Sequence, residues 1–170
     1  MTAATLPIIS MTQLESAAGL AQLRRAASDV GFFYLVDHGI SHESQQNYLR
    51  LSREFFQLSA QQKQSVDMIH SPHFRGYNAM GSEMTAGRLD AREQFDWMNE
   101  EQAIPDSALS QPWQKLIGPN LWPTSMPALK PSLTKLQDQL SDITVNLLQR
   151  LCASLGVEAH ALDYTIGKQP

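Results

Sequence analysis

Two stretches decide the fold of this 170-residue chain: GFFYLVDHG at residues 31–39 and RGYNAMGSEMTAGRLDAREQFDW at residues 75–97. The first contains five apolar residues in a row, Phe32 to Val36, between a glycine and an Asp-His-Gly turn. An unbroken apolar run of this length predicts a strand that is buried on both faces. The second stretch holds a glycine-rich loop and closes on Arg92 to Met98, which we predict to be extended. A further edge strand is predicted at Leu6 to Ser10.

Helical patterns surround these two stretches. Thr12 to Glu15 has the pattern of a capping box, which predicts a helix that ends at Gly31. A second helix is expected from about His42 to Leu58, and Ser59 to Gln62 is another capping box that opens a short third one. Leucines recur at threes and fours from Leu129 onward, which predicts one long helix. Residues 102–127, with five prolines, are expected to be an irregular connection.

Composition sets limits on the class of protein. The net charge of −4 and the isoelectric point near 5.7 give no basic field for nucleic acid or an anionic membrane surface. Cys152 is the only cysteine, so an internal disulfide and a cysteine-based metal cluster are excluded, and a buried thiol is expected. The sequence has no apolar run long enough to predict secretion or membrane insertion. We therefore expect a cytoplasmic protein without nucleic-acid or membrane partners.

Arg75-Gly76-Tyr77 is the best candidate for substrate contact. The arginine fork matches a carboxylate, the glycine permits close backbone approach, and the tyrosine adds an amphipathic wall. The tripeptide is weakly specific, and from the residues alone a surface arginine is the alternative.

Charged residues of both signs alternate after this tripeptide. Paired carboxylates suggest acid–base catalysis, but the neighbouring arginines and the lack of a visible apolar pocket favour a structural ion-pair network that fixes the loop. Its members are Glu83, Arg88, Asp90, Arg92, Glu93 and Asp96.

The five histidines do not predict an iron site. A non-haem iron triad takes two histidines and one carboxylate, and jelly-roll oxygenases supply the first two as His-x-Asp on one strand. The residues two positions after each histidine are Ile40, Ser44, Pro72, Arg75 and Leu162, none of them a carboxylate. We therefore expect no metal ligand and no catalytic residue in this chain.

The order and spacing of these segments resemble the N-terminal region of the isopenicillin-N-synthase-like non-haem Fe(II)/2-oxoglutarate-dependent dioxygenases. The resemblance runs from Leu6-Pro7-Ile8 through GFFYLVDHG, RGY, REQFD and the GPNLWP segment at 118–123 to the long helix. It implies a mainly helical α+β fold, whose few strands belong to the edge of a double-stranded β-helix, or jelly roll. The core of that jelly roll is missing from this chain. Residues 1–170 would then be the N-terminal domain, with the catalytic module expected after 170.

The resemblance also implies an oxidoreductase that uses Fe(II) and 2-oxoglutarate in the complete enzyme and acts on a small organic substrate. It places Arg75 and Tyr77 at the substrate, and gives a supporting role to five residues: Gly76, Glu83, Arg92, Glu93 and Asp96. This chain alone is expected to be inactive and to bind no cofactor, with the C-terminal jelly-roll module as its partner. The alternatives are a half-enzyme completed by another chain and a stand-alone helical protein-binding module.

Overall fold

The computed structural model describes residues 5–166, which divide into two compact units. Unit 1 comprises residues 5–41 together with 138–166, and unit 2 comprises residues 42–137. One long helix, α4 (Leu129–Ser154), contributes its first residues to unit 2 and the rest to unit 1.

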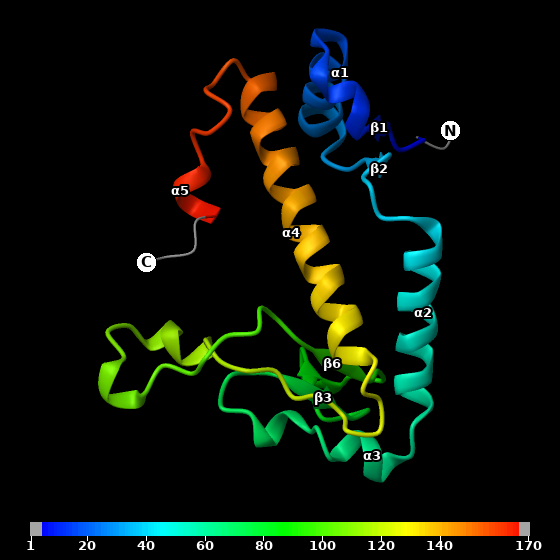
Figure 1. Cartoon of the computed structure of the whole chain (residues 1–170), viewed down its shortest axis with the longest axis vertical. Helices are drawn as coiled ribbons and strands as arrows, with labels where there is room; N and C mark the ends of the chain where they lie inside the picture. The colour runs from blue at the N-terminus through cyan, green and yellow to red at the C-terminus, as the bar shows by residue number, and fades with distance from the viewer. Residues whose placement is uncertain (1–4, 167–170) are drawn as a thin grey trace. The chain divides into compact units, whose positions relative to one another are not determined.

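Unit 1 is built on a pair of parallel strands, β1 (Ile8–Ser10) and β2 (Tyr34–Val36). The chain between them forms helix α1 (Ala17–Arg25), flanked by a 3₁₀ turn η1 (Met11–Glu15) and a π-helical turn η2 (Ala26–Val30). The end of α4 and a short helix α5 (Asp163–Ile166) complete the unit (Figure 1). Four residues form its buried core, with Leu147 and Leu151 of α4 packed against them: Ile9, Leu14, Leu23 and Ala26.

Two details of unit 1 correct the sequence-based predictions. Ser16, and not Thr12, caps the first α-helix, because its Oγ accepts a hydrogen bond from the Gly19 amide at 3.0 Å. The strand after Gly31 is not buried on both faces within this chain. Leu35 is partly buried against the core, whereas Phe32 is 74% and Tyr34 62% exposed. Among the described residues, the core of unit 1 covers only one face of the β1–β2 pair, so apolar residues on the other face remain in contact with solvent.

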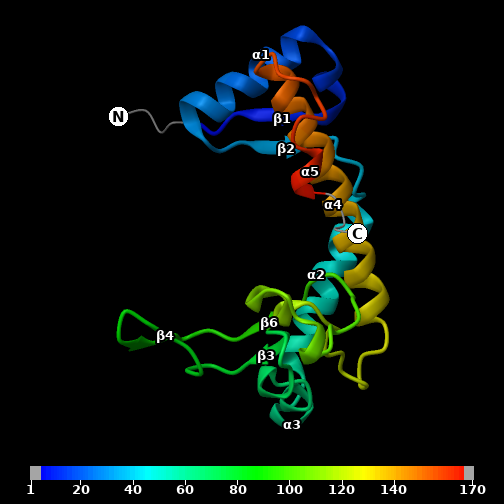
Figure 2. The same ribbon diagram turned by 90° about the vertical axis from the view of Figure 1, so that its left-hand side faces the viewer.

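Unit 2 begins with helix α2 (His42–Gln57) and the short helix α3 (Ala60–Gln64). The predicted capping box at Ser59 is confirmed, since the Ser59 amide and the Gln62 amide each bond the other residue's side chain. A 3₁₀ turn η3 (Met68–His70) follows, and strand β3 (Gly76–Asn78) then pairs antiparallel with β6 (Gln94–Asp96). Between them the chain forms the small hairpin of β4 (Met84–Thr85) and β5 (Arg88–Leu89) (Figure 2).

The core of unit 2 lies between α2, the β3–β6 pair and the first turns of α4. The buried residues come from these elements and from the turn after α3: Leu51, Phe55, Val66, Tyr77, Leu129 and Leu133. Residues 102–127 are largely irregular, as predicted, with two 3₁₀ turns, η4 (Asp106–Ala108) and η5 (Pro112–Leu116). Trp122 packs against the core from this segment.

The described part of the chain is thus mainly helical, with its strands in three two-stranded sheets. Cys152 is free and buried, as predicted. Within residues 5–166, no helix is both long enough and apolar enough to cross a membrane.

Candidate functional site

The pairing of β3 with β6 brings together the two halves of the sequence stretch at 75–97. In this register Gly76 lies opposite Asp96 and Tyr77 opposite Phe95. Gly76 has φ of +121°, and a Cβ there would lie 2.4 Å from the Val66 carbonyl oxygen. Only glycine fits this backbone position. Gly76 therefore lets β3 approach the turn at Val66 closely enough for the Tyr77 amide to donate to the Val66 carbonyl at 2.8 Å.

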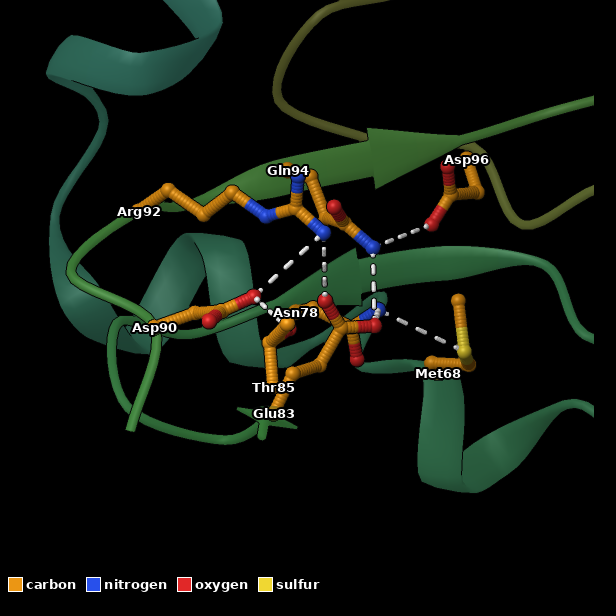
Figure 3. Close-up of polar contacts among 8 residues, drawn as sticks. All are labelled: Met68, Asn78, Glu83, Thr85, Asp90, Arg92, Gln94 and Asp96. Carbon is orange, nitrogen blue, oxygen red and sulfur yellow. Dashed lines mark hydrogen bonds and ion pairs between the residues drawn. The ribbon is translucent and has the colours of Figure 1, made fainter. Parts of the chain in front are cut away.

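Side chains along β6 alternate between two faces, as they do in any strand. One face, defined here as the inner face, carries Glu93, Phe95 and Trp97, and Phe95 and Trp97 pack against the core of unit 2. The other, the outer face, carries Arg92, Gln94 and Asp96, whose side chains lie in a row in Figure 3. The two faces hold different kinds of polar contact.

The inner face holds a partly buried ion pair. Lys63 Nζ lies 2.5 Å from Glu93 Oε2, and the Tyr77 hydroxyl donates to the same oxygen at 2.8 Å. The hydrogen bond from Lys63 holds the pKa of Glu93 below its ordinary value, and the same bond raises the pKa of Lys63. Burial, followed by the bond to Glu93, raises the pKa of Tyr77. The three side chains tie α3 to both strands.

The outer face holds a more open network, drawn in Figure 3. The Gln94 amide nitrogen donates to Glu83 Oε1 at 2.9 Å and to Asp96 Oδ2 at 3.1 Å, so one side chain joins two carboxylates. Arg92 pairs with Glu83 at 3.1 Å and with Asp90 at 3.5 Å, and its side chain is mostly exposed. These contacts link the β4–β5 hairpin to β6.

Arg75 is only 3% exposed and is engaged by the backbone. Its Nη1 donates to the His73 and Phe74 carbonyls, and its Nη2 donates to the Leu116 carbonyl at 2.8 Å. Beside it, His73 Nδ1 lies 2.8 Å from the Lys115 carbonyl. Together His73 and Arg75 hold the last carbonyls of η5, which no backbone donor of that short turn satisfies. Burial lowers the pKa of Arg75.

A pocket of about 400 Å³ opens next to these groups. It is large enough for a small organic molecule, whereas a second, mostly apolar cavity in the core of unit 2 offers only about 50 Å³. The larger pocket, called the β6 pocket below, is lined by Phe74, Arg75, Gln94, Asp96, Trp97, Met98 and Leu116.

Two features set the chemistry of the β6 pocket. Burial and the neighbouring Glu83 raise the pKa of Asp96, against weaker effects from Gln94, Arg92 and Arg75. Two N–H groups of lining residues, Arg75 Nε and Trp97 Nε1, are buried without a hydrogen-bond partner among the described residues. Such unpaired groups are rare in folded proteins and mark candidate binding sites.

The predicted site residues therefore occupy different surroundings. Arg75 and Asp96 line the β6 pocket, whereas Tyr77 is 5% exposed and has its hydroxyl on Glu93. Glu83 and Arg92 lie on the outer-face network, as Figure 3 shows.

Sequence reasoning missed Lys63, His73, Phe74 and Gln94. Lys63 follows a capping box and Gln94 lies in a predicted extended segment. These local patterns explain both residues, so no pattern in the sequence indicated that Lys63 pairs with Glu93 or Gln94 with Glu83 and Asp96. The sequence feature linked to His73 is Gly118. The His73 ring packs where this glycine leaves room, since a Cβ at Gly118 would lie 2.4 Å from the ring.

The described residues do not form a metal site. Within residues 5–166 no group of three or more histidine, cysteine, aspartate or glutamate side chains could hold a metal ion. His73 is bound to a carbonyl, and His160 is bound to Asp163 at 2.8 Å on the surface. The donor set of non-haem iron is thus not assembled in this part of the chain.

Residues 6–125 match the family model described as the N-terminal region of the non-haem dioxygenase in morphine synthesis. Among curated proteins, a 2-oxoglutarate-dependent dioxygenase of Gibberella zeae is 30% identical over 94% of this chain and 42% of its own length. A homoarginine-6-hydroxylase of Arabidopsis thaliana is 28% identical over 88% of this chain and 41% of its own length. The chain thus spans less than half the length of these relatives.

Solved structures of similar fold come from oxygenases. A Neurospora crassa protein, solved in full length with alpha-KG and thymine, matches with a TM-score of 0.71 at 19% identity, over 93% of this chain and 50% of that one. A 2OG-Fe(II) oxygenase family protein of Caulobacter crescentus matches with a TM-score of 0.71 at 18% identity, over 94% of this chain and 51% of that one. At these identities the likeness concerns the fold.

Proposed function

We propose that this chain is the N-terminal part of an Fe(II)- and 2-oxoglutarate-dependent oxygenase. The premise is that the chain belongs to the non-haem dioxygenase N-terminal family. The observation that carries the proposal is the family match over residues 6–125, which includes every residue of the β6 pocket. The named 2-oxoglutarate-dependent relatives support the same cofactor here. The proposed reaction is oxidation of a small organic molecule, in line with the size of the pocket.

The iron and 2-oxoglutarate would be held by a jelly-roll module that pairs with this chain, because the described residues do not fit an iron centre. The proposed task of this part is to hold the substrate in the β6 pocket and keep its walls in place. The exposed apolar residues of the β1–β2 sheet, Ile8, Tyr34 and Val36, support a contact with a neighbouring sheet. The lone buried Cys152 is compatible with the proposed cytoplasmic location.

The test compares the 170-residue chain alone with the same chain joined to the iron-binding part of the Gibberella zeae relative. Anaerobic Fe(II) titration and succinate formation from 2-oxoglutarate are measured for both. We expect about one equivalent of iron and succinate formation from the joined protein, and neither from the chain alone. Tight iron binding with turnover by the chain alone would contradict the proposal. A folded joined protein that binds iron but never turns over 2-oxoglutarate would also count against it.

Arg75 is the proposed substrate contact, because it lines the β6 pocket and is a hydrogen-bond donor. In the joined protein, Arg75→Ala should raise the substrate KM and leave the 2-oxoglutarate KM unchanged. Loss of a hydrogen bond to a charged group costs roughly 1.5–3 kcal/mol. Arg92→Ala is the matched control, because it removes an equal charge from the outer face without touching the pocket lining. Equal KM values for the wild type and Arg75→Ala would remove Arg75 from the site.

Tyr77 is proposed to act through Glu93. Its hydroxyl is already bonded to Glu93, and it does not line the β6 pocket. Neither observation supports direct substrate contact by Tyr77, which stays a prediction. The proposed supporting role is exerted through the strand pairing and the two networks on β6, and it is assigned to five residues: Gly76, Glu83, Arg92, Glu93 and Asp96.

A further inference from the structure

We infer that the β6 pocket takes a substrate whose side chain ends in a positively charged nitrogen group, an amine or a guanidine, which the Asp96 carboxylate binds. The inference rests on the proposed function and names the chemical class of its substrate.

The pairing of Asp96 is the first observation. A carboxylate can accept about four hydrogen bonds, yet Asp96 accepts one, from Gln94 at 3.1 Å, within the described residues. No ion pair joins Asp96 to a lysine or arginine in that part of the chain, although Arg75 lines the same pocket. Arg75 is held instead by three backbone carbonyls. The pocket therefore presents a carboxylate with acceptor capacity to spare.

The electrostatic surroundings of Asp96 favour an added positive charge. Its carboxylate is partly buried, and Gln94 holds it next to the carboxylate of Glu83. Burial and this second negative charge outweigh the positive charges of Arg92 and Arg75, which is why the pKa of Asp96 is raised. A cation bound at Asp96 offsets both effects, whereas an anion would add to them.

Phe74 supplies a second observation, independent of charge. It has φ of +62°, a left-handed conformation that is strained for a bulky residue. It lies between His73 and Arg75, which are both buried, while Phe74 itself is 67% exposed at the β6 pocket. An aromatic face attracts a cation, so Phe74 and Asp96 suit the same ligand group. Strain held at a ligand-facing residue is typical of binding sites.

The rest of the lining fits the body of such a molecule. Trp97, Met98 and Leu116 give apolar walls. A compact molecule with a cationic group and an apolar stem meets these surfaces.

The test is a binding titration of the ¹⁵N-labelled 170-residue chain by NMR, with arginine and citrulline as probes. Citrulline has the size and the α-ammonium group of arginine but carries a neutral urea in place of the guanidinium. The pair therefore tests the side-chain charge alone, and equal binding of the two would overturn the inference. We expect arginine to shift the amide signals around Asp96 and to bind at least about tenfold more tightly than citrulline. Glutarate is the anionic probe, and tighter binding of glutarate than of arginine would overturn the inference.

Two variants assign the binding to named groups. Asp96→Asn should weaken arginine binding about tenfold or more, and Asp90→Asn is the matched control, because Asp90 lies on the outer-face network outside the pocket lining. Phe74→Asn keeps a residue that tolerates the left-handed conformation and removes the ring, and it should weaken arginine binding about threefold to tenfold. Unchanged arginine affinity in Asp96→Asn, or no saturable arginine binding by the wild type, would overturn the inference.

These readouts need neither iron nor 2-oxoglutarate. Selective arginine binding that depends on Asp96, without turnover by the joined protein, would defeat the proposed function alone. Turnover by the joined protein without such selectivity would defeat the inference alone.

Discussion

The two faces of strand β6 carry the same kinds of charged group and use them differently. On the inner face Glu93 meets Lys63 at 2.5 Å, and the Lys63 side chain is only 10% exposed. On the outer face Arg92 meets Glu83 at 3.1 Å, but the Arg92 side chain is 61% exposed. Because solvent screens the outer pair more than the inner one, we expect the inner pair to matter more for stability. The outer face is left with a carboxylate, Asp96, that is available to a ligand.

The largest expected effect comes from breaking the inner pair. Glu93→Ala leaves Lys63 as a buried, uncompensated charge and the Tyr77 hydroxyl without its acceptor, and it should lower the free energy of unfolding by roughly 3 kcal/mol. Arg92→Ala, on the outer face, should cost about 0.5 kcal/mol or less. Urea unfolding followed by tryptophan fluorescence measures both. Similar losses for the two variants would contradict the distinction between the faces.

Arg75 tests whether a buried charge without an anionic partner is equally structural. Arg75→Ala frees three backbone carbonyls, including that of Leu116, and should destabilise unit 2 by about 2 kcal/mol. Arg75→Lys should recover part of the loss, since an ammonium group reaches fewer of these carbonyls. Amide hydrogen exchange would show the loss at residues 112–118. Unaltered exchange there would mean that Arg75 does not hold η5.

The pH dependence of stability separates the two faces by sign. Glu93 has a lowered pKa, so its contribution is present above the ordinary value of 4.5 and is lost as the pH falls through the lowered value. Lys63 has a raised pKa, so its contribution is present below the ordinary 10.5 and is lost as the pH rises through the raised value. The free energies of unfolding of the wild type and Glu93→Gln should therefore differ most between pH 4.5 and pH 10.5. A constant difference from pH 3 to pH 7 would contradict the role of Glu93.

The smallest expected effect is at Asp96, and it has the opposite sign. Because its pKa is raised, ionised Asp96 opposes folding at neutral pH, and stability is regained as the pH falls through the raised value. Asp96→Asn should leave the chain equally stable or more stable by less than about 1 kcal/mol. The melting temperature at pH 7 measures this. A clear loss of stability would mean that Asp96 has a structural role instead of the ligand-binding one.

Much of the fold was predictable from local patterns. Helix α2 and the buried stripe through Tyr48, Leu51 and Phe55 follow from apolar spacing, and Ser59 and Gln62 form the capping box that their spacing predicts. The first helix was predicted to begin too early, since the Ser at position 16 outcompeted Thr12 as its cap. The exposure of Phe32 and Tyr34 was not predictable, because burial of a strand depends on the neighbours that it finds and not on its own composition.

The candidate site shows the same division. The sequence by itself determined the family and the absence of a His-x-Asp pair, since both depend on residue identity and spacing, whereas the roles of Arg75 and of Arg92–Asp96 stay predictions. Only the tertiary structure decided which charge meets which. Glu93 pairs with Lys63, 30 positions away, and Arg75 donates to the carbonyl of Leu116, 41 positions away. Such pairings follow from how β3 and β6 pack against α3 and η5, and no local pattern encodes them, because the interaction of two charges depends on their distance and burial in space.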